Sequence, residues 1–442
     1  MNVRLPRWLY PGMHLKRWLL LVLLGIVILG LGGAVLLLDI YRGQALDEIP
    51  IFFYLTGAWL DRPVRAAILG GIGLLVTVLG IWGLMRSLVS PLVVRGDSVM
   101  EVIYTKRYLA RGPRIVAIGG GTGLSTLLRG LKGYSANITA VVAVADDGGS
   151  SGRLRQQLGI VPPGDIRNCI AALADAEPLM TQLMQYRFPA GSGLDDHAFG
   201  NLFIAAMTAV TGDFEEAVRE SNRVLAVRGQ VLPATTVPLN LSARLVSGHQ
   251  LYGQVSMAST EEPIDQVFIE PADVRANPEA IERILEADMI VIGPGSLFSS
   301  VLPNLLISDI RDAVGAANGM KVYVCNVATQ PGETGHFTAS SHLKALFAHV
   351  GDDLVDYVLL NRNLNARQPE GWLGQPVEVD ERRLEEMHVV IVEEDVIDPT
   401  NAHRHDPAKL ATALMRLQQE DRVERPRQRR PRRMRRPTAT AS

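Results

Sequence analysis

The sequence predicts an α/β protein with an open, mostly parallel sheet and flanking helices, preceded by two transmembrane helices. Three observations indicate this fold class. Two long apolar segments without a charged residue lie within the first ninety residues. From residue 114 onward, continuous apolar runs alternate with helical segments, and glycine or polar residues follow those runs directly. Strands that alternate with helices are typical of parallel sheets, whose strands are buried on both faces.

Composition restricts the class of protein. The chain has 442 residues, of which 47% are hydrophobic and 20% are charged, and its mean hydropathy is +0.14. These values exclude a disordered or fibrous chain, because such chains have too little apolar surface to form a core. The formal net charge of −2 is an average over unlike parts. Residues 1–18 carry +4 and residues 422–436 carry +8, so the remainder carries −14.

Residues 19–38 and 66–85 are two apolar runs of twenty residues each, without a charge. At 1.5 Å per residue each helix would be about 30 Å long, which matches the hydrocarbon core of a bilayer. For the first run a cleaved signal peptide is the alternative, but its apolar region is normally roughly 7–15 residues long. Two spans place both termini on one side, and the basic residues that flank them favour the cytoplasm. We therefore expect a multi-pass plasma-membrane protein whose N-terminus and main domain are cytoplasmic.

Other segments bear on compartment and partners. The segment 49–60 is too short to span, and its aromatic residues suit the membrane interface. The tail contains nine arginines. We expect it to be disordered and to contact anionic lipid, at about 1 kcal/mol per basic residue; a solvated charged tail is the alternative. Nucleic acid is not expected, because no aromatic side chain is interleaved with these arginines. Cys169 and Cys325 are expected to be small buried side chains in a protein of a reducing compartment.

Apolar periodicity and helix-end signals predict the elements of the middle of the chain. Strands are expected at 114–118, 138–145, 289–292, 321–327, 355–360 and 388–392, with short β segments between 230 and 256. Helices are expected at 124–132, 165–176, 197–210, 213–227, 278–287, 307–317, 340–350 and 407–419. Asp213 is placed as an N-cap, and Asn277 caps a helix that begins with proline.

A glycine run follows the first strand, and ligands of such sheets bind beyond the carboxyl ends of the strands. The run consists of Gly119, Gly120, Gly121, Thr122 and Gly123. Glycines let backbone N–H groups approach a phosphate, and a helix N-terminus adds partial positive charge. The run is not a dinucleotide fingerprint, because Leu124 occupies the third glycine position, and no lysine follows as in a Walker loop. A plain tight turn is the alternative.

Two adjacent carboxylates, Asp146 and Asp147, follow the second strand. The residues after them are Gly148, Gly149, Ser150 and Ser151. Carboxylates at a strand end bind ribose hydroxyls or a divalent cation, and the residues behind them add N–H and hydroxyl donors. Mg²⁺ is the one cofactor that this pattern suggests. A polar turn is the alternative.

Further candidates lie at helix starts. Gly164, Asp165 and Asn168 open one predicted helix, where Asp165 is equally well a plain N-cap. His197 and Asn201 open another, and a lone histidine there is more often structural than catalytic.

Polar residues also follow the later strands. The turn after 289–292 consists of Gly293, Pro294, Gly295 and Ser296, and Asn326 lies near the end of 321–327. Because so many strands end in glycine or polar residues, a shared cleft for a phosphorylated molecule is the economical interpretation. His403 and His405 are expected in a solvated loop, since no carboxylate or cysteine accompanies them as in a metal site.

Six segments resemble, in order, the gluconeogenesis factor family (YvcK-type), which is related to the phospholactate transferase CofD of deazaflavin cofactor synthesis. They are GGGTG at 119–123, DDGGSSGRLR at 146–155, PPGDIRN at 162–168, DHAFGNL at 196–202, GPGSLFSSVLPNLL at 293–306 and NVATQPGET at 326–334. The resemblance implies a Rossmann-like fold that binds a nucleotide diphosphate or nucleotide sugar. It also implies links to UDP-sugars, cell shape, envelope synthesis and growth on gluconeogenic carbon sources.

The resemblance assigns roles to several of these residues. The loop 119–123 and the turn 293–296 would hold phosphates, Asp146 and Asp147 would lie near the ribose or a magnesium ion, and Asp165 and Asn201 would line the cleft. The two spans and the arginine-rich tail depart from the family pattern. We expect a membrane anchor at 1–90, a nucleotide-sugar-binding domain at 111–395, a helix at 396–420 and a disordered tail at 421–442.

Two functions are compatible with these features. The first is a membrane-tethered, UDP-sugar-binding regulator that performs no chemistry, because no nucleophile or acid–base pair is evident from the sequence. The second is a magnesium-dependent transferase of the CofD kind, in which Asp146 or Asp147 holds the metal. Envelope-synthesis proteins and a second copy of the chain are the expected macromolecular partners.

Overall fold

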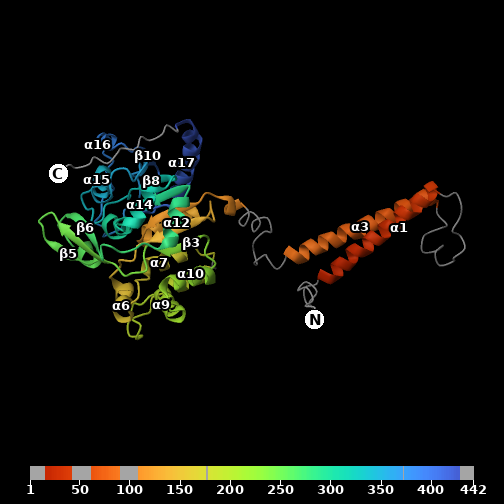
Figure 1. Cartoon of the computed structure of the whole chain (residues 1–442), viewed down its shortest axis with the longest axis horizontal. Coiled ribbons are helices and arrows are strands. Elements are labelled where there is room, and N and C mark those ends of the chain that lie inside the picture. Colours follow the sequence, from red (N-terminus) through yellow and green to blue (C-terminus); the bar gives the residue numbers. More distant parts are fainter. Residues whose placement is uncertain (1–14, 42–60, 90–107, 176–177, 372, 429–442) are drawn as a thin grey trace, which may run out of the picture. The chain divides into compact units, whose positions relative to one another are not determined.

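The computed structural model covers the whole chain and describes residues 15–41, 61–89, 108–175, 178–371 and 373–428. The chain divides into two compact units, Met1–Lys106 and Arg107–Ser442. The first contains a pair of helices and the second contains the sheets (Figure 1). Each unit is described by itself.

The first unit is built from α1 (Leu15–Tyr41) and α3 (Arg62–Val89), which pack against each other. Apolar windows of 18 and 22 residues within them have a mean hydropathy of 2.2, and only 11% and 17% of these windows are buried. By length and composition, both helices are therefore able to cross a membrane. They contain the predicted runs 19–38 and 66–85, whereas the segment 49–60 lies outside the described residues.

Glycines line the contact between α1 and α3. A Cβ atom on Gly73 would lie 2.7 Å from the backbone nitrogen of Leu29, and one on Gly80 would lie 2.7 Å from the side chain of Val22. Small residues of this kind let two helix backbones approach closely, as in membrane helix pairs. By contrast, a Cβ on Gly71 would meet nothing within 4 Å.

The second unit is organised around a seven-stranded parallel sheet in the order β10-β9-β8-β7-β1-β2-β3. Its strands are β1 (Ile115–Gly119), β2 (Ile138–Val142), β3 (Gln230–Pro233), β7 (Met289–Ile292), β8 (Met320–Val324), β9 (Tyr357–Asn361) and β10 (Val390–Glu394). Every residue of β1, β2, β7 and β8 is buried. This burial explains why the central strands are mostly apolar, and it confirms the predicted α/β fold with a mostly parallel sheet.

Helices flank the sheets of this unit and cover both faces of the main one. They are α5 (Gly121–Leu131), α6 (Gly149–Leu158), α7 (Gly164–Leu173), α8 (Pro178–Gln185), α9 (Phe199–Thr211), α10 (Phe214–Val224), α11 (Gln254–Ala258), α12 (Pro278–Glu286), α13 (Leu302–Leu305), α14 (Ser308–Ala316), α15 (Ala339–Val350), α16 (Glu381–Leu384) and α17 (Pro407–Gln428). On one face of the main sheet α5 packs between α7 and α17, and on the other α12 packs against α14. The connections β1–α5–β2 and β7–α14–β8 run in opposite directions, so right-handed crossovers place α5 and α14 on opposite faces.

Two smaller sheets complete the unit. Strands β4 (Asn240–Leu245), β5 (Gln250–Tyr252) and β6 (Ile264–Glu270) form an antiparallel sheet in the order β5-β4-β6, drawn in green in Figure 1. Strands β11 (Ile397–Asp398) and β12 (Asn401–His405) form a short antiparallel pair before α17.

Most predicted elements are present, with shifted ends. The helix expected from residue 124 begins earlier, since α5 starts at Gly121 within the glycine run. The helix expected at 407–419 is present within α17, but the wider helical segment 396–420 is not, because β11 and β12 lie between residues 397 and 405. Helix α17 extends to Gln428, into the segment expected to be disordered. Residues 429–442 lie outside the described residues.

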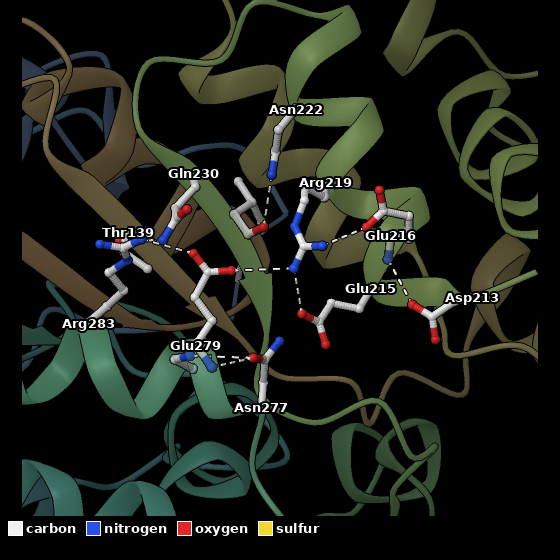
Figure 2. Close-up of polar contacts among 12 residues, drawn as sticks. Thr139, Asp213, Glu215, Glu216, Arg219, Asn222, Gln230, Asn277, Glu279 and Arg283 are labelled. Carbon is white, nitrogen blue, oxygen red and sulfur yellow. Dashed lines mark hydrogen bonds and ion pairs between the residues drawn. The ribbon is translucent and has the colours of Figure 1, made fainter. Parts of the chain in front are cut away.

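A polar network joins α10 to α12 at the edge of the main sheet, as Figure 2 shows. Arg219 on α10 contacts Glu216 at 2.6 Å and, across the gap, Glu279 on α12 at 3.6 Å. Asp213 accepts a hydrogen bond from the backbone N–H of Glu216, and Asn277 accepts one from that of Glu279. Both predicted caps are therefore confirmed. Half-exposed ion pairs of this kind contribute about 0–1 kcal/mol each, so capping and packing fix these helices.

Substitution of Gly73 by leucine is expected to separate α1 from α3, because the new side chain would overlap Leu29. The separation can be followed with cysteines at positions 32 and 69, since a Cβ on Gly32 would lie 3.4 Å from that of Leu69, within reach of a disulfide. Oxidative cross-linking of this pair should fall several-fold in Gly73→Leu and persist in Gly71→Leu. Equal cross-linking in the two variants would contradict the close contact.

Candidate functional site

The site lies where the order of the main sheet reverses. From β1 the chain proceeds through β2 to β3 on one side, and then returns to place β7, β8, β9 and β10 on the other. The carboxyl ends of β1 and β7 are neighbours, because Ile118 pairs with Ile292 in parallel register. In open α/β sheets, ligands bind in the crevice outside such a reversal.

The glycine run forms the first wall of this crevice. Gly120 is extended and precedes α5, and Gly121 begins the helix with a φ of +64°. A Cβ on Gly123 would lie 2.6 Å from the carbonyl oxygen of Pro294, so only glycine fits where the two turns meet. The N–H groups of the first turn of α5 have no partners within the helix and lie at the positive end of its dipole.

The second wall is the turn 293–296. Gly293 has a φ of +81° and Gly295 a φ of +156°, so this turn also requires glycine. Asn326 holds Gly295 from both sides: its Oδ1 accepts from the Gly295 N–H at 3.1 Å, and its Nδ2 donates to the Gly295 carbonyl at 2.9 Å. Asn304 donates to the carbonyl of Gly119 at 3.1 Å. Side chains therefore fix both turns.

Between the two turns opens a cavity of about 640 Å³, here called the cleft. Its volume falls within the usual range for small-molecule sites. Ten of the predicted ligand residues line it: Gly120, Gly121, Thr122, Gly123, Asp146, Asp165, Pro294, Gly295, Ser296 and Asn326. Gly119 and Gly293 support the turns from behind without lining the cleft.

A smaller hollow of about 270 Å³, here called the side hollow, adjoins the cleft, and Asp146 and Asp165 line both. The other predicted residues in it are Gly148, Gly149, Ser150, Ser151, Gly164, Asn168 and Asn201. His197 lies behind it, where its Nδ1 is 3.1 Å from the Ser150 hydroxyl. Ser150 also accepts from Asn201 Nδ2 and from the Ala198 N–H, so His197 has a structural contact there.

Asp165 is the most perturbed carboxyl group in the site. It remains partly open to the cavity, but protein surrounds it. Desolvation and the neighbouring Asp146 carboxylate raise the pKa of Asp165 from 3.8 to about 6, although the Gly121 N–H donates to it. Two carboxylates in one partly desolvated place repel each other, so a cation or hydroxyl donor from a ligand would stabilise them.

The structure separates Asp146 from Asp147. Asp147 accepts from the Val255 N–H at 3.2 Å, beside Gly253 and the start of α11, and it lines a different hollow. Within the described ranges no group of three or more His, Cys, Asp or Glu side chains is gathered as for a metal ion. The carboxylates that fit Mg²⁺ in the cleft are Asp146 and Asp165, with ligand or water oxygens completing the shell.

The sequence interpretation missed several residues of the cleft. Thr126 and Arg129 line it beside the predicted Thr122, and the spacing of four and three residues places all three on one face of α5. That polar stripe was visible in the sequence. The expectation that His403 and His405 lie in a solvated loop is wrong, because β12 places both at the cleft and His405 is buried. Burial lowers the pKa of His405 to about 4, and its neutral ring contacts the Cys325 carbonyl.

Comparison with known proteins agrees with this geometry. The family model described as 2-phospho-L-lactate transferase CofD matches residues 115–397, from the first residue of β1 to β11. The chain belongs to the CofD family. The matched range contains both glycine turns, both carboxylates and the side hollow, whereas the cleft residues of β12 lie just beyond it.

Individual relatives carry a second description. A protein from Bacillus subtilis (strain 168), described as gluconeogenesis factor, is 47% identical over 317 residues, which cover 71% of this chain and all of the relative. A crystal structure of a Bacillus halodurans protein matches with 43% identity and a TM-score of 0.66, covering 69% of this chain and all of that one. The family resemblance and the Rossmann-like fold are thereby confirmed.

The N-terminal unit is not peculiar to this chain, contrary to the expected departure from the family pattern. A relative from Nostoc sp. is 46% identical over 431 residues, covering 92% of this chain and 91% of its own length. The second unit, residues 107–442, makes up only about three quarters of the chain. The alignment therefore extends well into the first unit.

Gly123→Ala is expected to force the two turns of the CofD-family domain apart, because its Cβ would meet the Pro294 backbone at 2.6 Å. The overpacking should lower the free energy of unfolding by about 1–3 kcal/mol. Gly119→Ala is the matched control, since its Cβ would make only ordinary contacts at 3.8 Å. Urea denaturation followed by circular dichroism measures both, and equal stability of the two variants would refute the close contact.

Asp165→Asn is expected to stabilise the ligand-free protein at pH 8 and to change little at pH 3. An acid whose pKa is raised in the fold opposes folding when ionised, and this opposition is absent below the unfolded-state pKa. A pKa of about 6 corresponds to an effect on the order of 1–3 kcal/mol. Asp312→Asn, on an exposed carboxylate, is the control for thermal melts at both pH values. Destabilisation by Asp165→Asn at pH 8 would contradict the assignment.

Proposed function

We propose that the CofD-family domain binds a UDP-sugar in the cleft, and that the chain is a membrane-tethered regulator of envelope synthesis, cell shape and carbon metabolism. The observation that carries the ligand class is the pair of glycine turns, held face to face at the reversal of the sheet. Such turns present several N–H groups to one small region, which suits a diphosphate.

The remaining lining of the cleft supports a nucleotide diphosphate. Arg129 on α5 and Arg404 on β12 add positive charge at two of its walls, and arginine binds phosphate oxygens with bidentate hydrogen bonds. Asn326, Thr329 and Gln330 add polar groups beyond the second turn. The choice of uridine rests on the likeness of the six segments to the gluconeogenesis-factor branch.

The hydrogen bonds of the serine and threonine hydroxyl groups favour a regulatory role over catalysis by a hydroxyl nucleophile. Among the described residues that line the cleft, no serine or threonine has a hydrogen bond to a histidine. Ser150, which does contact His197, accepts from both Ala198 and Asn201. Both acceptor positions of its oxygen are thus occupied, which suits a structural hydroxyl better than a nucleophile.

Membrane tethering is proposed from the first unit. Helices α1 and α3 have apolar lengths that match a bilayer and side chains that are mostly exposed within the structure. Exposed apolar surface on this scale is unfavourable in water, and burial in lipid removes it. The basic residues that flank the spans favour the cytoplasmic side for the CofD-family domain.

A magnesium-dependent transferase of the CofD kind is the second candidate. The proximity of Asp146 and Asp165 favours it, since burial and the Asp146 carboxylate together raise the pKa of Asp165. A divalent cation held there would supply charge stabilisation to a diphosphate in the cleft. The two candidates differ in whether the bound nucleotide is consumed.

Calorimetric titration of the full chain in detergent tests the ligand. UDP-glucose should bind, and Arg404→Gln should weaken binding by about tenfold, because a charge-assisted contact to phosphate is lost. Arg223→Gln, on an exposed arginine of α10, should leave the affinity unchanged. Absence of UDP-glucose and UDP-N-acetylglucosamine binding would sink the proposal.

Product analysis separates the two candidates. The chain is incubated with Mg²⁺, a deazaflavin alcohol and a nucleotide-diphosphate-activated phospholactyl donor. Under the regulatory proposal no product forms while UDP-sugar still binds. Formation of the phosphodiester would establish the transferase in its place.

A further inference from the structure

The side hollow contains two arginines that the proposed nucleotide site does not use. Arg167 and Arg187 line it together with the starts of α6, α7 and α9. Its volume of about 270 Å³ is small for a nucleoside and sufficient for a small acidic group. Asp146 and Asp165 form its boundary with the cleft, so a group attached to a diphosphate in the cleft would reach it past these carboxylates.

Arg167 is a buried cation without an ion-pair partner. It is only 8% exposed, its stem packs on Gly200, and its Nε has no hydrogen-bond partner. Its Nη2 donates to Asn168 Oδ1 at 2.8 Å, which is a neutral acceptor. Across the described residues, no carboxylate oxygen lies within ion-pair distance of it. A buried guanidinium in this state is costly, and contact with an anion would offset the cost.

Arg187 adds a second positive charge to the same wall. It is half-exposed, and its Nη1 donates to the backbone and side-chain oxygens of Asp196 at 3.1 and 3.2 Å. Burial and the nearby Arg187 lower the pKa of Arg167, whereas Asp165 and Asp146 raise it; the net direction is downward, so the two guanidinium groups repel each other. An anion between them would remove this repulsion.

Neutral donors and an acceptor complete the hollow. The first turn of α6 begins at Gly149, whose φ is +50°, and its N–H groups have no acceptors within the helix. Asn201 is 2% exposed and donates to Ser150, while its Oδ1 has no partner. That oxygen suits a hydroxyl group next to the acid.

We propose that the side hollow is a subsite for a second anionic group, a carboxylate or phosphate, recognised by Arg167 and Arg187. The group is carried on the sugar of the nucleotide ligand or comes from a separate small acid. The first source rests on the proposed function, because it needs the nucleotide in the cleft. It predicts that acidic nucleotide sugars bind more tightly than neutral ones.

The test is calorimetric titration of the full chain with UDP-glucose, UDP-glucuronate and inorganic phosphate. UDP-glucuronate should bind about tenfold more tightly than UDP-glucose. This ratio should fall towards one in Arg167→Gln and Arg187→Gln and persist in Arg223→Gln. Because Arg167 is buried, its variant can fail to fold; the half-exposed Arg187 then decides, with thermal melts as the check.

Each outcome has one meaning for the subsite. A ratio near ten that depends on both arginines supports an acid on the nucleotide ligand. A ratio near one, with phosphate binding that both arginine substitutions weaken about tenfold, supports a separate acid. A ratio near one without arginine-dependent phosphate binding overturns the proposal. The proposal also fails if both arginine substitutions leave the tenfold ratio, or the phosphate binding, unchanged. If neither UDP-sugar binds, the proposed function fails, and phosphate alone still decides the subsite.

Discussion

The contact between the two glycine turns is the constraint on which the site depends. Gly123 at the start of α5 lies so close to Pro294 that no side chain fits between them. This contact joins the first and second halves of the sheet at their reversal. Asn326, from the end of the next strand, then holds Gly295 by two hydrogen bonds. The N–H groups of α5 are therefore positioned before a ligand arrives, which lowers the entropic cost of binding.

Negatively and positively charged side chains alternate around the contact between the two glycine turns. Asp146 and Asp165 lie between the cleft and the side hollow, and their mutual repulsion contributes to the raised pKa of Asp165. The cationic side chains lie on the outer sides, with Arg404 in the cleft and Arg167 in the side hollow. A ligand with negative groups beside the arginines, and with a hydroxyl group or a bound cation beside the two carboxylates, would complement every one of these charges.

The sequence predicted the features that depend on local physics. Central strands are apolar because both faces are buried, and the caps Asp213 and Asn277 follow from hydrogen bonding within one turn. The strand-end rule located both glycine turns correctly, since parallel strands bring their carboxyl ends to one edge.

Tertiary placement was beyond that reasoning. Arg167 lies in the first turn of α7, and no sequence pattern distinguishes it from a surface arginine. In the fold, Gly200 of α9 packs against its side chain and contributes to its burial. His405 became part of the cleft because β11 and β12 pair, and two such short strands give almost no periodic signal. Asp146 and Asp147 are equivalent in the sequence, and only the loop path sends their side chains to different hollows.

That divergence connects the cleft to the rest of the domain. Asp146 lies in the cleft, and the next residue, Asp147, accepts from the Val255 N–H at the start of α11. Gly253, which follows β5, packs directly on the Asp147 carboxylate. Under the proposed regulatory function, a ligand that displaces Asp146 is expected to act, through one peptide bond, on α11 and the β5-β4-β6 sheet. The proposed regulatory function requires such a path from the ligand to the surface, and the mostly exposed strand β5 is an edge of the kind to which a partner strand can add.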